Sequence, residues 1–177
     1  VVLSNNDGCV IARSKEAKAL GVGMGVPWFK VKDHYLKNGG YAFSSNFALY
    51  GDMSARVMNI LESVSPSVEV YSIDEAFLDL DTLDKNFNLY KFGCHVKGLI
   101  KQWTGVPVRV GIAPTKTLTK VAIYQVKKMN VATRVVQLIT QQEIIKALSL
   151  TPVGEVWGVG RRLNQHLQQM GIVSALD

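Results

Sequence analysis

The strongest constraint on the fold of this chain is the run from residue 68 to residue 80, where Asp74 and Glu75 interrupt a segment rich in β-branched, aromatic and leucine residues. Charge is least expected inside such a segment, because burying it is costly. Neighbouring side chains of a regular strand face opposite sides, so the two carboxylates reach one point only where the strand bends. We therefore predict a β-hairpin that joins residues 68–72 to residues 76–80, with the carboxylates at its apex.

Two interpretations of this apex remain open. Convergent carboxylates repel each other, and a divalent cation that prefers hard oxygen ligands would remove the repulsion, which predicts a Mg²⁺ site. The simpler alternative is an exposed turn with two solvated acids. The six residues 72–77 alone do not separate these interpretations.

The first part of the chain reads as a small, loop-rich region. We predict strands at residues 1–3 and 9–13, followed by a short helix with Ser14 as its N-cap and Gly21 at its end. Glycine and proline residues break the segment that follows up to residue 45.

From residue 46 the apolar spacing becomes helical until Pro66. After the hairpin come a second amphipathic helix ended by Gly105 and an alternating strand at residues 106–112. The order α-β-β-α-β matches an α+β, ferredoxin-like unit without its first strand, which would precede Val1, with residues 1–45 inserted after it.

In the last third of the chain, the residue pattern predicts a helix after Thr115 and a strand at residues 134–138. It also predicts a helix that begins with the capping box Thr140-Gln-Gln-Glu143. The turn Gly158-Val159-Gly160 then leads into a leucine-bearing helix. This arrangement is similar to a helix-hairpin-helix module, whose backbone amides bind a DNA phosphate without reading sequence. A plain corner between two helices is the alternative.

Several cations stand where helix N-termini disfavour them. They lie around Ser14, after Pro114 and after Gly160, and comprise Arg13, Lys15, Lys18, Lys116, Arg161 and Arg162. A phosphate at each helix start would make these positions favourable. Lys116, Lys120 and Lys127 also fall within a ~40° arc of one helix, with Lys128 beside them. With a net charge of +6, this stripe indicates a polyanionic partner, although solvated surface lysines would give the same pattern.

Composition excludes several classes of protein. Cys9 and Cys94 have neither zinc-site nor disulfide spacing, and no apolar run is long enough to span a membrane. We expect a soluble, cytoplasmic protein. The chain begins without Met in an apolar run and stops just after a Gly-Ile pair, so we expect it to be a segment of a longer protein.

Five blocks in order resemble the Y-family of translesion DNA polymerases, and within it the UmuC-type catalytic subunits of DNA polymerase V. They are Ser-Asn-Asn-Asp-Gly-Cys-Val-Ile-Ala-Arg (4–13), Glu-Ala-Lys-Ala-Leu-Gly-Val (16–22), Phe-Ser-Ser-Asn (43–46), Ser-Ile-Asp-Glu-Ala-Phe (72–77) and Gly-Ile-Ala-Pro-Thr-Lys (111–116). The resemblance implies fingers at 1–45, a palm at 46–133 and part of a thumb at 134–177. It also implies error-prone synthesis during the SOS response to DNA damage.

The resemblance further implies template-directed nucleotidyl transfer by two Mg²⁺ ions. Asp74 would bridge both metals, Glu75 would bind the ion that activates the primer, and Ser72 would lie beside the primer end. Lys18 and Lys127 would grip the dNTP triphosphate. Cys9 would lie over the nascent base pair, or simply be a buried structural residue. The implied partners are primer–template DNA, a UmuD-type subunit, a RecA filament and a sliding clamp.

Two departures from the family pattern limit this resemblance. Lys15 stands where many members have a tyrosine that contacts the triphosphate. The first metal-binding aspartate and the aromatic residue that excludes ribonucleotides belong to the missing strand, and Asp7 is not that aspartate. The carboxy-terminal DNA-gripping domain and a clamp motif are also absent, so we expect this chain alone to be inactive.

Two other classes of protein share parts of the pattern. One is a catalytically inactive DNA-binding protein that uses the helix-hairpin-helix and the lysine stripe. The other is a nucleotidyl cyclase, which has a similar palm but no use for a DNA-phosphate hairpin.

Overall fold

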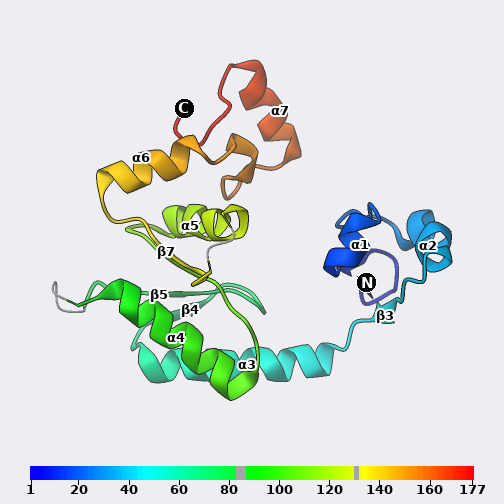
Figure 1. Cartoon of the computed structure of the whole chain (residues 1–177), viewed down its shortest axis with the longest axis horizontal. Coiled ribbons are helices and arrows are strands. Elements are labelled where there is room, and N and C mark those ends of the chain that lie inside the picture. Colours follow the sequence, from blue (N-terminus) through cyan, green and yellow to red (C-terminus); the bar gives the residue numbers. More distant parts are fainter. Residues whose placement is uncertain (83–86, 130–131) are drawn as a thin grey trace. The chain divides into compact units, whose positions relative to one another are not determined.

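The computed structural model describes residues 1–82, 87–129 and 132–177, and it is an α+β structure, as predicted (Figure 1). Residues 83–86 and 130–131 of the predicted palm lie outside the described residues. The chain divides into two compact units, Val1–Asp52 and Met53–Asp177, with the boundary inside one long helix.

The first unit is a small three-stranded sheet with two helices. Its elements are β1 (Val2–Leu3), β2 (Val10–Ala12), α1 (Lys15–Ala19), α2 (Trp28–Lys37), β3 (Phe43–Ser44) and the start of α3 (Phe47–Val64). Strand β1 is central, antiparallel to β2 and parallel to β3. A small core holds the unit together and consists of Val1, Leu3, Val10, Ala17, Val22 and Tyr35. The predicted strands and the Ser14 cap of α1 are confirmed.

The prediction of a loop-rich segment up to residue 45 is wrong for α2. Pro27 does not break this stretch but stands at the N-cap, where a missing N–H costs no helical hydrogen bond. Trp28, Val31 and Tyr35 recur at helical spacing and pack on the core of the unit. That spacing was the signal for the helix.

The second unit contains the rest of α3 and all later elements. They are β4 (Val68–Val70), β5 (Ala76–Leu78), α4 (Leu89–Thr104), β6 (Val110–Ile112), α5 (Lys116–Lys128), β7 (Val135–Gln137), α6 (Gln141–Ser149), the 3₁₀ turn η1 (Val153–Glu155) and α7 (Arg161–Gln169). The predicted helices and the capping box of α6 are confirmed.

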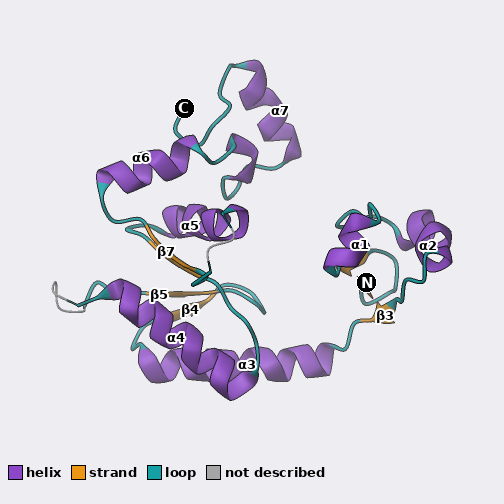
Figure 2. Cartoon of the chain, viewed as in Figure 1, coloured by secondary structure: helices purple, strands orange, loops and turns teal. Residues whose placement is uncertain are grey.

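Helices cover both faces of the strands of the second unit (Figures 1 and 2). Buried residues of α3 and α4, among them Leu61 and Val96, pack with the hairpin strands. On the other side, Val121 and Ala122 of α5 pack against α6. A Cβ atom at Gly111 of β6 would lie 2.5 Å from the carbonyl oxygen of Thr119, so glycine lets α5 approach the strand closely.

The strand predicted at residues 106–112 is shorter than expected. Only Val110–Ile112 pairs, in parallel with β7. Val106 and Val108 keep the predicted half-buried alternation with exposed Pro107, but their burial comes from packing on the α3–α4 core. Among the described residues, the β4–β5 and β6–β7 pairs form separate two-stranded sheets. Within the same residues, no helix is both long and apolar enough to cross a membrane.

Candidate functional site

The predicted hairpin is confirmed, with the acidic pair in its turn. Strands β4 and β5 pair antiparallel from Val68 and Leu78 to Val70 and Ala76. The hairpin turn (residues 71–75) is closed by the carbonyl oxygen of Glu75, which accepts hydrogen bonds of 3.0 Å from two backbone N–H groups, those of residues 71 and 72. A short turn between two anchored strands therefore carries both carboxylates.

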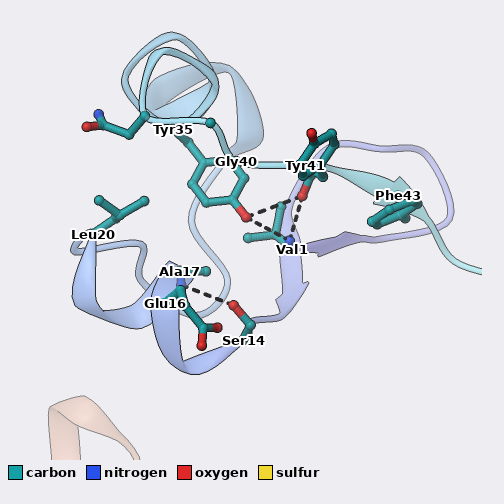
Figure 3. Close-up of a pocket in the computed structure, with 11 residues that line it drawn as sticks. Val1, Ser14, Glu16, Ala17, Leu20, Tyr35, Gly40, Tyr41 and Phe43 are labelled. Atoms are coloured by element: carbon teal, nitrogen blue, oxygen red, sulfur yellow. Dashed lines mark hydrogen bonds between the residues drawn. The ribbon is translucent and has the colours of Figure 1, made fainter.

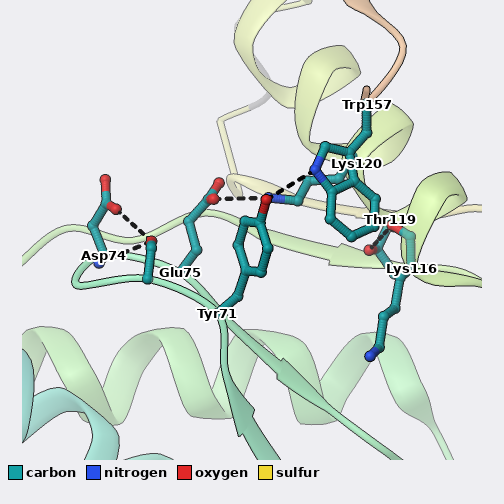
Figure 4. A network of polar contacts seen from close by, with 8 residues as sticks. Tyr71, Asp74, Glu75, Lys116, Thr119, Lys120 and Trp157 are labelled. Carbon is teal, nitrogen blue, oxygen red and sulfur yellow. Dashed lines mark hydrogen bonds and ion pairs between the residues drawn. The ribbon is translucent and has the colours of Figure 1, made fainter. Parts of the chain in front are cut away.

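Asp74 is exposed and is oriented by a neighbouring hydroxyl. The Oγ atom of Ser72 donates a 2.8 Å hydrogen bond to Oδ1 of Asp74, and the backbone N–H of Asp74 donates to the same Oγ at 3.4 Å. The carboxylates of Asp74 and Glu75 extend to the same side of the hairpin (Figure 4). The turn thus presents oxygen ligands in one direction.

Glu75 is paired with a lysine from α5. The Oε2 atom of Glu75 lies 2.7 Å from Nζ of Lys120 (Figure 4). The Lys120 side chain is only 18% exposed, whereas that of Glu75 is 45% exposed. The ammonium group therefore approaches the acidic turn from the protein side.

Three aromatic rings surround this ammonium group. Nζ of Lys120 lies 4.6 Å from the ring centroid of Tyr71 and 5.4 Å from those of Phe77 and Trp157. We call these three residues the aromatic cage. The indole Nε1 of Trp157 also donates a 3.1 Å hydrogen bond to the hydroxyl of Tyr71. Sequence reasoning missed the cage, because nothing in the sequence brings residue 157 next to residues 71 and 77.

Lys116, one helical turn before Lys120, is paired with Glu69 of β4 in a more open setting. Both partners are about half exposed, and Lys116 contacts one cage ring, Phe77, at 5.4 Å. Lys127 lies exposed at the other end of α5. The predicted lysine stripe therefore contains two members that are already paired with acids of the hairpin.

The donor set of the hairpin turn suits a hard cation in part. Asp74 and Glu75 offer carboxylate oxygens, the ligands that Mg²⁺ prefers. Among the described residues, no group of three or more Asp, Glu, His or Cys side chains could hold one ion. The two carboxylates can thus supply part of a coordination sphere, with further ligands from water, phosphate or additional residues.

Among the described residues, no side chain caps the start of α7. Its N-cap is Gly160, which offers no side-chain hydrogen bond, and its first turn contains no acid. Arg161 and Arg162 follow, and both are exposed. Gly158 in the preceding turn has a φ of +92°, a conformation that favours glycine. Within that part of the chain, the first N–H groups of the helix thus lack a capping side chain and lie next to two guanidinium groups.

The predicted nucleotide-binding residues of the first unit lie around α1. Lys15 and Lys18 are exposed, and Cys9 is half-buried with a free thiol. Arg13 is half-buried instead: Nη1 donates a 2.8 Å hydrogen bond to the carbonyl oxygen of Val22, and within the described part of the chain its buried Nε has no partner. Arg13 thus has a structural contact that the sequence did not indicate.

A pocket of about 310 Å³ opens in the same unit (Figure 3). It is lined by the start of α1, where Ser14 Oγ accepts a 3.2 Å hydrogen bond from the backbone N–H of Ala17, and by Tyr35, Tyr41 and Phe43. None of the four nucleotide-binding residues predicted in this unit lines it. The pocket therefore adds no lysine or arginine to the predicted nucleotide-binding residues.

Residues 1–123 match the model of the impB/mucB/samB family. Protein ImpB of Salmonella typhimurium is 53% identical over the whole chain, and Protein UmuC of the same species, strain LT2, is 49% identical. The chain spans 42% of the length of each. DNA polymerase IV of Sulfurisphaera tokodaii is 30% identical over 98% of the chain and 48% of its own length.

Solved structures show the same fold over almost the entire chain. A crystal structure of DinB from Sulfolobus solfataricus is 26% identical, with a TM-score of 0.79 over 98% of this chain and 50% of that protein. A structure described as a Dbh ternary complex with partially disordered substrates gives a TM-score of 0.79 at 27% identity, with the same coverage.

Proposed function

The chain belongs to the impB/mucB/samB family, and from this premise we propose that it forms part of an error-prone translesion DNA polymerase. The reaction is template-directed nucleotidyl transfer to a primer, during the SOS response to DNA damage. The chain spans less than half of the two Salmonella relatives, so the activity belongs to the whole protein.

One observation carries this proposal. The hairpin turn presents Asp74 and Glu75 to the same side of the hairpin, with the cations of α5 beside them (Figure 4). A polymerase needs clustered carboxylates for metal binding and nearby positive charge for phosphates.

Asp74 and Glu75 would hold Mg²⁺, and when bound the metal would lower the pKa of the primer hydroxyl and neutralise charge on the triphosphate. The residues of the chain do the positioning. Ser72 orients Asp74 through its 2.8 Å hydrogen bond and lies next to the place proposed for the primer end. Lys120 holds Glu75.

The cations of both units serve nucleotide and DNA. We propose that Lys18 and Lys127 bind the triphosphate, with Lys15, Arg13 and Cys9 nearby. The hydrogen bond of Arg13 to a backbone carbonyl supports an indirect contribution, in which it shapes the segment that carries the other residues.

Phosphates of the DNA backbone would be bound at the start of α7, in a helix-hairpin-helix. Gly158 and Gly160 leave the amides accessible, and Arg161 and Arg162 supply charge. Lys116 and Lys120 would add to the field at the DNA, although their pairing with Glu69 and Glu75 reduces the charge that they present.

The division of the chain into polymerase domains is proposed from the family resemblance. We propose fingers at residues 1–45, a ferredoxin-like palm at 46–133 and a partial thumb at 134–177. A further strand between the β4–β5 and β6–β7 pairs would complete the palm and bring a third carboxylate. We also propose a cytoplasmic protein with a UmuD-type subunit, a RecA filament and a sliding clamp as partners.

Primer extension on a lesion-bearing template, with the product of the whole reading frame that contains these residues, tests the proposal. We expect Mg²⁺-dependent extension past the lesion. An inactive DNA-binding protein would bind the template without extending it, and a cyclase would convert nucleotides without DNA. Relatives named DNA polymerase IV do not favour either alternative.

A further inference from the structure

We propose that Lys120 is the built-in counter-cation of Glu75: held in the aromatic cage, it fixes this carboxylate before a metal binds and raises the Mg²⁺ concentration that the site requires. The inference deepens the proposed function and depends on its assignment of Glu75 as a metal ligand. It concerns a positioning residue, because Lys120 acts through Glu75.

The setting of the Lys120 ammonium group is unlike that of an ordinary surface lysine. A single ring near a lysine is common, but here three rings lie between 4.6 and 5.4 Å from Nζ, and a carboxylate oxygen lies at 2.7 Å. The rings exclude water and attract the cation, so the ion pair is less screened than one on an open surface.

Lys116 provides an internal comparison for this arrangement. It also leaves α5 to pair with a glutamate of the hairpin, but its side chain is 49% exposed, against 18% for Lys120. It contacts one ring of the cage, whereas Lys120 contacts all three. The same helix and hairpin thus form an open pair and a caged pair, and only the caged pair includes a proposed metal ligand.

Trp157 connects the cage to a distant part of the sequence. Its ring packs at 5.3 Å and 88° against Tyr71 and at 5.9 Å against Phe77, and its indole N–H is bonded to the Tyr71 hydroxyl. Trp157 leads directly into the Gly158–Gly160 turn. A change in the conformation of that turn would therefore move the Trp157 ring that contacts Lys120. The strength of the Lys120–Glu75 pair therefore depends on where the start of α7 lies.

The Lys120–Glu75 ion pair should weaken metal binding at the hairpin turn. The ion pair uses Oε2 of Glu75 and leaves Oε1 as a ligand. A positive charge this close to the carboxylate opposes a second cation. Removing the charge should therefore strengthen metal binding, whereas a residue that merely maintains the fold would weaken it when changed.

Mn²⁺ alone, counted by electron paramagnetic resonance in solutions of the product of the whole reading frame, tests this inference. In Lys120→Met we expect the half-saturating Mn²⁺ concentration to fall about fivefold. Lys120→Arg keeps the charge and should match the parent, Trp157→Leu should give a smaller decrease, and Lys116→Met should change the value by less than about twofold. Circular dichroism of each variant checks folding.

The outcomes separate this inference from the proposed function. If Asp74→Asn abolishes Mn²⁺ binding while Lys120→Met binds as the parent does, or more weakly, the inference is overturned and the metal site stands. If the parent whole-frame protein binds no Mn²⁺ that depends on Asp74, both are overturned. A tighter site in Lys120→Met, together with parent-like binding by Lys120→Arg, establishes the counter-cation.

Discussion

The starts of helices α5 and α7 look alike in sequence but differ in structure. Each begins with a basic residue, and neither has an acid in its first turn. At α5, Thr115 Oγ1 accepts a 3.2 Å hydrogen bond from the N–H of Leu118, and Lys116 is paired with Glu69. At α7, the Gly160 cap supplies no side-chain acceptor, and Arg161 and Arg162 are exposed.

The difference teaches that misplaced cations at helix starts have two separate uses. Lys116, at the start of α5, is held by an acid of the hairpin, Glu69. Arg161 and Arg162 of α7 stand beside amides that no side chain of the described residues caps, which is the arrangement that binds a phosphate. Sequence spacing predicted all of them as phosphate contacts and could not separate the two groups.

Between these two helix starts, the largest expected effect is on DNA binding by the arginines of α7. In Arg161→Ala combined with Arg162→Ala, we expect DNA affinity to fall at least about tenfold, because each phosphate contact releases counterions. The slope of log affinity against log salt should decrease by up to about 2. Fluorescence anisotropy of a labelled primer–template at several salt concentrations measures both. The control is Lys146→Ala, an exposed lysine of α6, and an unchanged slope in the double variant would remove α7 from the DNA site.

A second test places an acid on the α7 amides. Gly160 has an extended backbone, with φ −81° and ψ 174°, and open space around a Cβ atom, so Gly160→Asp should fit. The new carboxylate should cap the helix and raise stability by about a few tenths of a kcal/mol. It should also lower DNA affinity about fivefold, because it occupies the phosphate position. Thermal unfolding measures the stability and anisotropy measures the DNA affinity. If both rise, or both fall, the proposed phosphate site at the start of α7 is contradicted.

A smaller effect is expected at the start of α5. Lys116→Met should reduce DNA affinity only about two- to threefold, because Glu69 already offsets the charge of Lys116. Glu69→Gln should raise affinity slightly by releasing that lysine. The same anisotropy assay applies, and a loss as large as that of the α7 double variant would show that pairing does not reduce the role of Lys116.

The smallest effect concerns the start of α6, where the protein supplies its own anion. The backbone N–H groups of Thr140 and Ile139, followed by the Thr140 hydroxyl, hold the pKa of Glu143 below its ordinary value. Its stabilising effect is therefore present above pH ~4.3 and is lost as the pH falls through the lowered pKa. Parent and Glu143→Gln should differ in thermal stability near pH 6 and converge in acid. A difference that does not shrink as the pH falls would exclude this cause.

Much of the fold could be predicted because local patterns agree with the tertiary structure. Helices α3 to α7, the hairpin around Asp74 and the Thr140 capping box follow from apolar spacing and cap residues. Helix α2 does not follow from the sequence in this way, because a proline usually breaks a helix, whereas Pro27 stands at the N-cap of this one. The shortened β6 could not be foreseen, because strand pairing depends on a partner distant in sequence.

The candidate site divides in the same way. Asp74 and Glu75 were identified from charge in an apolar run, which is a local signal. The aromatic cage depends on contacts across 43 or more residues of the sequence, from Phe77 and Tyr71 to Lys120 and Trp157, and no local pattern carries it. The pairing of Lys116 with Glu69 was hidden for the same reason.

The central claim is that the hairpin turn supplies metal ligands for nucleotidyl transfer. Primer extension by the product of the whole reading frame, compared between parent and Asp74→Ala, tests it most directly, with Asp81→Ala as an exposed control outside the proposed site. We expect Asp74→Ala to lose at least about a thousandfold in extension rate and to bind DNA within about twofold of the parent. Extension at the parent rate by Asp74→Ala would contradict the metal assignment.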